Sequence, residues 1–269
     1  MFTEITLQII VIYALTGVFA GVMGGMLGLG GGIIIVPVLH FLFMRQGFPP
    51  EILMHLAVTT SLATIIVTSL ASTYTHHKKE AVIWPVVNRF APGILVGAGF
   101  GALLADSLSS NVLRIVFGVF ETLVAIQIWF EFKPKASRTL PDTVGMVSTG
   151  TGIGLFSTLL GIGGGTLTVP FLLWCNVNIR NAVAVSSACG FPIAVAGTTS
   201  LIIAGWDNSL VPVHSLSYLY WPAGLIIVAM TVFFAPMGAR LAHYLPVLTL
   251  KRIFSILLLI IGIRMLVQI

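Results

Sequence analysis

The sequence predicts an all-α polytopic membrane protein made of two inverted repeats. Three observations support this prediction: the composition, an internal repeat and the placement of the basic residues. Of the 269 residues, 57% are hydrophobic and only 8% are charged, whereas soluble domains carry about 25% charged residues. The basic residues that give the net charge of +5 fall in short loops, where they orient membrane segments and do not indicate nucleic-acid binding.

The internal repeat is centred on a glycine cluster followed by a proline. Residues 28–37 read GLGGGIIIVP, and residues 161–170 read GIGGGTLTVP. The repeat extends to the next segment, where AVTT at 57–60 matches AVSS at 184–187. We therefore expect a first membrane repeat over residues 1–131, a cytoplasmic linker over 132–142 and a second membrane repeat over 143–269.

Each repeat is expected to hold four full transmembrane helices and one short half-helix. A helix needs about 20 apolar residues to cross a bilayer, and the apolar piece after each glycine cluster is too short. The full segments are expected at 5–27, 52–74, 82–105 and 111–130 in the first repeat, and at 144–160, 182–204, 218–242 and 250–267 in the second. The half-helices are expected at 33–44 and 166–175.

The basic residues favour a hairpin between each half-helix and the segment before it. If segment and half-helix formed a single crossing, the 13 Lys and Arg residues would divide almost evenly between the two sides. If they form a hairpin, only Arg45, Arg114 and Arg264 lie on the side opposite the other basic residues. The positive-inside rule prefers this second arrangement. It gives five segments per repeat, so the repeats insert in opposite directions and both termini face away from the cytoplasm.

The two glycine clusters are the predicted substrate site. Glycine and proline should break the helix at each cluster, and broken segments at corresponding positions of two halves indicate a transporter's binding site. The first N–H groups of each half-helix would point at the tip of the hairpin, and two such helix ends can bind an anion without a basic side chain. Hydroxyls of the next segment would add neutral donors. The predicted substrate-binding residues are Gly30, Gly31, Gly32, Gly163, Gly164, Gly165, Thr166, Thr59, Thr60, Ser61, Ser186 and Ser187.

Structural roles are the alternative for these residue types. Glycines at small-xxx-small spacing, such as Gly17, Gly21 and Gly25, are typical of close helix packing. Hydroxyls also bond to their own helix or join helices in membranes. Neither glycine cluster has the Lys-Ser or Lys-Thr pair of a nucleotide-binding P-loop, and the dinucleotide-binding pattern fails because position 33 is Ile.

Glu121 is the candidate for carrying a coupling proton. It lies inside the segment expected at 111–130, and an intramembrane carboxylate is costly and usually faces the interior of the bundle. Pairing with a base or a hydroxyl is the alternative role. The corresponding position of the second repeat is apolar, which argues against a role at a symmetric centre.

With these residues the chain resembles the TauE/SafE family of sulfite exporters, also called the sulfonate uptake permease family. The resemblance covers nearly the full length and rests on the doubled glycine motif with its proline, the hydroxyl-bearing segments and the charged central linker. It implies a multi-pass protein of the bacterial inner membrane that transports sulfur-containing oxyanions, such as sulfite, sulfoacetate or related organosulfonates, without a cofactor. The family includes proposed exporters and proposed importers.

We expect a secondary transporter that exports such anions by alternating access. The alternatives are an importer of another small organic anion and an anion channel, which would need no coupling residue. An enzyme is not expected, because the histidines are scattered, no HExxH or GxSxG pattern occurs, and carboxylates are nearly absent from the segments. The expected partners are the anion, a coupling proton and the lipid bilayer, with no metal and no nucleic acid.

Overall fold

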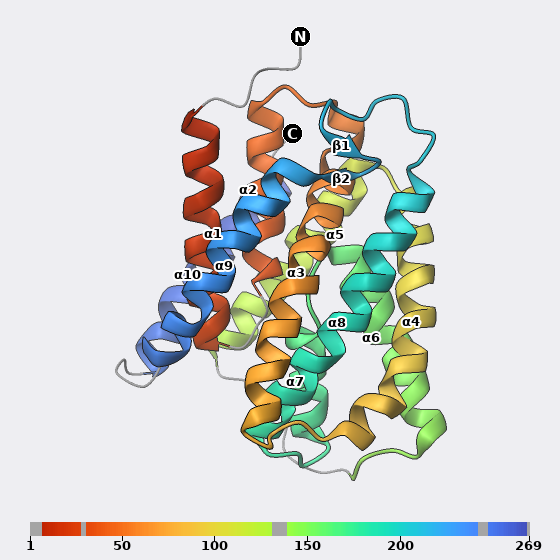
Figure 1. Cartoon of the computed structure of the whole chain (residues 1–269), viewed down its shortest axis with the longest axis vertical. Coiled ribbons are helices and arrows are strands. Elements are labelled where there is room, and N and C mark those ends of the chain that lie inside the picture. The colour runs from red at the N-terminus through yellow and green to blue at the C-terminus, as the bar shows by residue number, and fades with distance from the viewer. Residues whose placement is uncertain (1–6, 28–30, 131–138, 242–246, 268–269) are drawn as a thin grey trace.

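The computed structural model describes residues 7–27, 31–130, 139–241 and 247–267, and most of them are helical (Figure 1). The first half contains α1 (Leu7–Leu27), α2 (Gly32–Arg45), the 3₁₀ helix η1 (Pro50–Ile52), α3 (Leu53–Lys78), α4 (Trp84–Ser107) and α5 (Ser110–Trp129). The second half contains α6 (Thr143–Leu160), α7 (Gly165–Trp174), α8 (Ile179–Ala204), the strands β1 (Ser215–Leu216) and β2 (Leu219–Tyr220), α9 (Trp221–Leu241) and α10 (Val247–Val267). Six helices of the described part are long and apolar enough to cross a membrane. The all-α polytopic fold is therefore confirmed.

Both predicted half-helices are present as short helices after the glycine clusters. Helix α2 has 14 residues and α7 has 10. Helix α2 turns back along α1 (Figure 1). Accordingly, the Gln46 side chain, just after α2, donates a hydrogen bond of 2.6 Å to the Tyr13 hydroxyl near the start of α1. The first half therefore contains the hairpin that the basic residues favoured.

Several boundaries differ from the expected ones by three or four residues; α8 and α10, for example, each begin three residues before their expected starts. Helix α3 continues through His76, His77 and Lys78, where we expected a loop, because basic side chains in the last turn interact favourably with the negative end of the helix dipole. Helix α9 begins at Trp221, whereas we expected a segment from residue 218. Tyr218 and the two residues after it belong instead to a hairpin in which β1 pairs antiparallel with β2.

The helices pack in pairs that join the two halves. Helix α1 packs on α9, α4 on α6, α3 on α8, and α5 on α10. By sequence α1 corresponds to α6 and α4 to α9, so the α1–α9 pair is the counterpart of the α6–α4 pair and the two exchange under the repeat. The other two pairs map onto themselves, because α3 corresponds to α8 and α5 to α10. A two-fold relation between the halves would produce this pairing; the inverted repeat itself stays a prediction, as do the domain boundaries.

The exchanged pairs are held together by glycines. On α1, a Cβ atom added at Gly17 would lie 2.7 Å from the Cβ of Met230, and one at Gly21 would lie 3.0 Å from the Cα of Thr231, both on α9. On α4, a Cβ atom at Gly101 would lie 3.0 Å from the Cα of Leu155 on α6. These spaces are too small for any side chain, so the small-xxx-small spacing at these glycines serves close helix packing.

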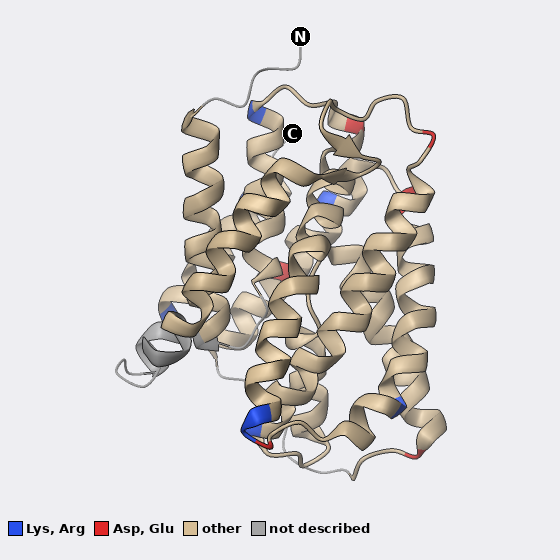
Figure 2. Ribbon diagram, viewed as in Figure 1, with Lys and Arg blue, Asp and Glu red and all other residues tan. Residues whose placement is uncertain are grey.

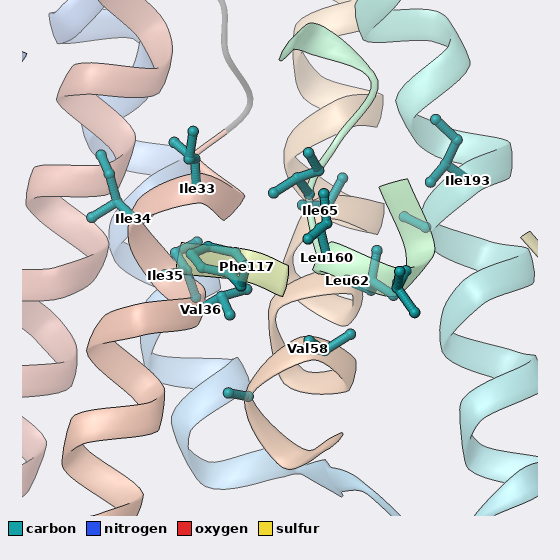
Figure 3. Packing of buried hydrophobic residues seen from close by; sticks show 14 of the residues in the cluster. Ile33, Ile34, Ile35, Val36, Val58, Leu62, Ile65, Phe117, Leu160 and Ile193 are labelled. Carbon is teal, nitrogen blue, oxygen red and sulfur yellow. The ribbon is translucent and has the colours of Figure 1, made fainter. Parts of the chain in front are cut away.

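Charged residues lie mostly at the two ends of the bundle (Figure 2). At one end the Arg180 side chain, on the first turn of α8, donates a hydrogen bond of 2.9 Å to the Lys79 carbonyl after α3. We call this the basic end, and it is defined by Lys78, Lys79, Arg89 and Arg180. The interior between the ends is apolar and includes Ile33–Val36 of α2 and Val58, Leu62 and Ile65 of α3 (Figure 3).

Candidate functional site

The glycine tips of the two hairpins meet inside the bundle. A Cβ atom added at Gly32 would lie 2.8 Å from the carbonyl oxygen of Gly161 and 3.1 Å from the Cα of Ile162. The Ser61 hydroxyl donates a hydrogen bond of 2.8 Å to the same Gly161 carbonyl. The first tip therefore touches the second, and α3 binds the second tip directly.

Each half-helix begins at its tip without a side-chain cap. Gly31 precedes α2 and Gly164 precedes α7, and neither helix end receives a side-chain capping bond. The Gly31 carbonyl accepts from the N–H groups of residues 34 and 35, and the Gly164 carbonyl accepts from those of residues 167 and 168. The earlier N–H groups of both helices have no intrahelical acceptor, so helix geometry allows them to donate to a ligand.

A cavity of about 90 Å³ lies between these two helix ends. Six of the predicted residues line it: Gly31, Gly163, Gly164, Gly165, Ser186 and Ser187. Two helix N-termini and two serines of α8 thus surround one space inside a membrane bundle. This arrangement offers N–H and O–H donors but no basic side chain, which suits a small anion.

The other described residues of the predicted site are not part of the cavity lining. Thr60 accepts a hydrogen bond of 3.1 Å from the N–H of Tyr220, while Thr59 is fully buried and its hydroxyl has no partner among the described residues. Gly32, Ser61 and Thr166 do not line the cavity either. Gly30 falls outside the described residues.

Hydroxyls outside the predicted set form one wall of the cavity. They are Thr68, Ser69 and Ser72 of α3. The Ser72 hydroxyl donates a hydrogen bond of 3.0 Å to that of Ser187, so this wall faces the serines of α8. The spacing i, i+1 and i+4 indicates one polar face of a helix, but the repeat does not preserve it, because positions 195 and 196, which correspond to Thr68 and Ser69, are Val and Ala.

The two sides of the tips differ in the residues that surround them. Ser72 lies six residues before Lys78 on α3, about 9 Å from the basic end along the helix. On the opposite side, Phe43, Phe48 and Tyr220 are buried and pack with ring centroids 5.2–5.4 Å apart. This aromatic cluster and the bond from Tyr220 to Thr60 close the side away from the basic end.

Glu121 on α5 is fully buried and does not line the cavity. Its two carboxylate oxygens have no hydrogen-bond partner among the described residues. A charged carboxylate would be costly in such surroundings, so the surroundings of Glu121 favour the uncharged, protonated carboxyl. Across the described part of the chain, no three His, Cys, Asp or Glu side chains are grouped so that they could hold a metal.

Comparison with known proteins identifies one family. The model of the family described as sulfite exporter TauE/SafE matches residues 13–265. A probable membrane transporter protein of Haemophilus influenzae is 36% identical over 266 residues, which cover 98% of this chain and 99% of the relative. The probable membrane transporter protein YunE of Bacillus subtilis is 30% identical over 278 residues, with coverage of 96% and 97%. A third, from Methanocaldococcus jannaschii, is 26% identical over 256 residues, with coverage of 94% and 93%. No solved structure matches the chain.

Proposed function

Because the chain belongs to the TauE/SafE family of multi-pass membrane transporters, we propose that it exports small sulfur-containing oxyanions across the bacterial inner membrane. Sulfite, sulfoacetate and related organosulfonates are the proposed substrates. The observation that carries this proposal is the cavity between the N-termini of α2 and α7, with Ser186 and Ser187 in its wall. The family's description as sulfite exporter supports both the sulfur oxyanion and the outward direction.

The proposed mechanism is alternating access, in which one repeat moves against the other around the tips. The difference between the two sides of the tips supports it. Ser186 and Ser187 line a cavity, whereas their counterparts Thr59 and Thr60 are fully buried. In the opposite state, the aromatic cluster would separate and Thr59 and Thr60 would be exposed, while the wall formed by Ser72 and Ser187 would close.

Glu121 is the proposed site of the coupling proton. Its burial and its lack of a partner among the described residues support this role, because a protonated carboxyl is far less costly in a bilayer than a carboxylate. The carboxyl does not line the cavity, so it would act on the equilibrium between the two states and would not touch the anion.

Efflux from proteoliposomes tests the proposal. Vesicles containing the purified protein are loaded with labelled sulfite, and its release is measured with and without a pH gradient. Gly164→Leu should reduce release at least tenfold, because the added side chain would enter the space beside Thr168 and Ile193 at the N-terminus of α7. Gly152→Leu is the matched control, since a Cβ atom at Gly152 meets nothing within 4 Å.

Two results would contradict the proposal. A folded Gly164→Leu protein that releases sulfite at the wild-type rate would reject the tip site. Release of sulfite, sulfate and chloride at similar rates, together with an electrical current that Glu121→Gln leaves unchanged, would identify an anion channel. Folding of each variant is checked by gel filtration and thermal unfolding in detergent.

A further inference from the structure

The β-hairpin of residues 215–220 lies at the end of the bundle away from the basic end (Figure 1). It is part of the gate, by which we mean the aromatic cluster together with the bond from the Tyr220 N–H to the Thr60 hydroxyl. Its two strands have only two residues each, and a hairpin of this size is not stable by itself. Its contacts with the helices therefore hold it in place.

Tyr218, at the turn of this hairpin, makes most of these contacts. Its side chain is 4% exposed. Its hydroxyl donates a hydrogen bond of 3.0 Å to Asp106 at the end of α4 and accepts one of 3.1 Å from Asn208 after α8. Its ring packs on the imidazole of His55 on α3, with ring centroids 5.0 Å apart. One side chain thus ties the hairpin to α3, to α4 and to the segment after α8.

The surroundings of His55 fit only the uncharged imidazole. The side chain is 4% exposed, and its Nε2 lies 3.0 Å from the carbonyl oxygen of Ala105. Because a carbonyl can only accept, Nε2 carries the proton, and Nδ1 is the nitrogen with the lone pair. Nδ1 has no hydrogen-bond partner among the described residues. A second proton there would create a buried charge and a donor without an acceptor, which is unfavourable.

Asp106 is the charged group that acts on His55 from a neighbouring helix. Its carboxylate accepts from the Tyr218 hydroxyl and makes no hydrogen bond to the imidazole. None of the other charged or titratable side chains described at this end bonds to His55; they are Tyr13, His40, Arg45, Glu51, Arg114, Asp207, His214, Tyr220 and Arg264. The structure therefore offers the imidazolium no direct partner.

We propose that His55 is a proton-operated latch on the gate. This inference rests on the alternating access of the proposed function. A neutral His55 packs on Tyr218, and the hairpin keeps the aromatic cluster closed. When the gate opens and water reaches the imidazole, His55 takes up a proton that the closed arrangement does not accommodate, so acid at this end holds the gate open. This proton site is separate from Glu121 on α5.

Labelling of a cysteine behind the gate with a maleimide tests the latch in the purified full chain in detergent. The reporter is Thr59→Cys, because Thr59 is fully buried and precedes Thr60, which bonds to the hairpin. The native Cys175 and Cys189, both buried, are replaced by alanine. Ser209→Cys, at an exposed position, is labelled separately. The ratio of the two rates removes the pH dependence of the thiol and measures how often the gate opens.

The ratio should rise about tenfold between about pH 8 and about pH 5.5, because an exposed histidine titrates near about pH 6.5 and the closed gate excludes the proton. His55→Gln keeps a donor for the Ala105 carbonyl but takes up no proton, so its ratio should not change with pH. The matched control is His214→Asn, since His214 is exposed beside the hairpin and has a positive φ that asparagine tolerates. This variant should respond like the wild type.

The wild-type series can overturn the latch without any His55 variant. A constant ratio would do so, and so would a ratio that falls in acid, because the imidazolium would then pair with Asp106. A rise that persists in folded His55→Gln would assign the proton to another group. Addition of sulfite separates the latch from the proposed function: a ratio that changes with sulfite but not with pH overturns the latch alone, and a ratio that changes with neither also rejects alternating access.

Discussion

Gly161 is the position where the contact between the two hairpin tips can be tested most directly by substitution. It ends α6 with φ of +67° and is buried. A Cβ atom there would lie 2.9 Å from the Cγ2 of Val36 and 2.9 Å from the Cα of Val58. The second of these atoms is backbone and cannot move aside alone. Gly161→Ala should therefore destabilise the protein.

The magnitude follows from three contributions. A left-handed conformation costs an alanine about 1–2 kcal/mol, and forcing an extra methyl into a packed interior costs about 1–3 kcal/mol. Restricting the unfolded chain returns about 0.4–1 kcal/mol. The free energy of unfolding should fall by roughly 1–4.6 kcal/mol, and transport should fall with it because the displaced tip no longer meets α2.

The assay is equilibrium unfolding in mixed detergent micelles, followed by circular dichroism. Gly163→Ala is the control, because a Cβ atom there has only ordinary contacts with Ile65, at 3.6 and 4.0 Å, and Gly163 does not have a positive φ. The control should change the free energy of unfolding by no more than about 1 kcal/mol. Equal stability of the two variants would refute the tip contact as the structure describes it.

Three further predictions address coupling, the end opposite the basic end, and orientation. Glu121→Gln keeps the size of the side chain but cannot exchange a proton, so sulfite efflux should lose its response to a pH gradient while anion binding is retained; an unchanged response would reject proton coupling at this carboxyl. Burial raises the pKa of Tyr218, so its hydroxyl stays protonated and donates a hydrogen bond of 3.0 Å to Asp106. Tyr218→Phe should lower the free energy of unfolding by about 0.5–1.5 kcal/mol, and this loss should be the same at every pH between about 6 and 8. A loss that varies across this pH range would contradict the role of the hydroxyl as donor. A C-terminal reporter that works only in the cytoplasm should stay inactive, and an active reporter would reverse the predicted orientation.

The sequence predicted the helices well because hydropathy and the repeat act over whole segments. It located the breaks after each glycine cluster, since glycines followed by a proline interrupt a helix, and a bilayer admits such an interruption only inside the protein or beside a cavity. It missed the β-hairpin at residues 215–220, because a pair of two-residue strands leaves no periodic pattern. It also missed the aromatic cluster of Phe43, Phe48 and Tyr220, because Tyr220 is distant from the two phenylalanines in the sequence and meets them only in the packed structure.

The candidate site was predicted in part, and the packing of the two repeated helices α3 and α8 explains which part. Helices α3 and α8 pack together and run antiparallel (Figure 1), and Ser72 contacts Ser187. Thr60, the counterpart of Ser187, is twelve residues from Ser72 and therefore about 18 Å farther along α3. Equivalent hydroxyls of the two repeats thus lie at opposite sides of the tips, and they cannot share one site.

The same geometry explains why the glycine tips do meet. The repeat places equivalent residues of α3 and α8 at an offset of 127 positions, as for Thr60 and Ser187. Ser72 faces Ser187 on this antiparallel pair. Six residues earlier on α3 and six residues later on α8, position 66 therefore faces position 193, which is its own counterpart in the repeat. Both tips are found at this level: an added Cβ atom at Gly32 of the first tip would lie 3.0 Å from the Cδ1 of Ile65, and one at Gly164 of the second tip would lie 3.3 Å from the Cδ1 of Ile193. If a two-fold axis relates the halves, residues near that axis meet their counterparts, so a repeated motif predicts a shared site only where it lies on the axis.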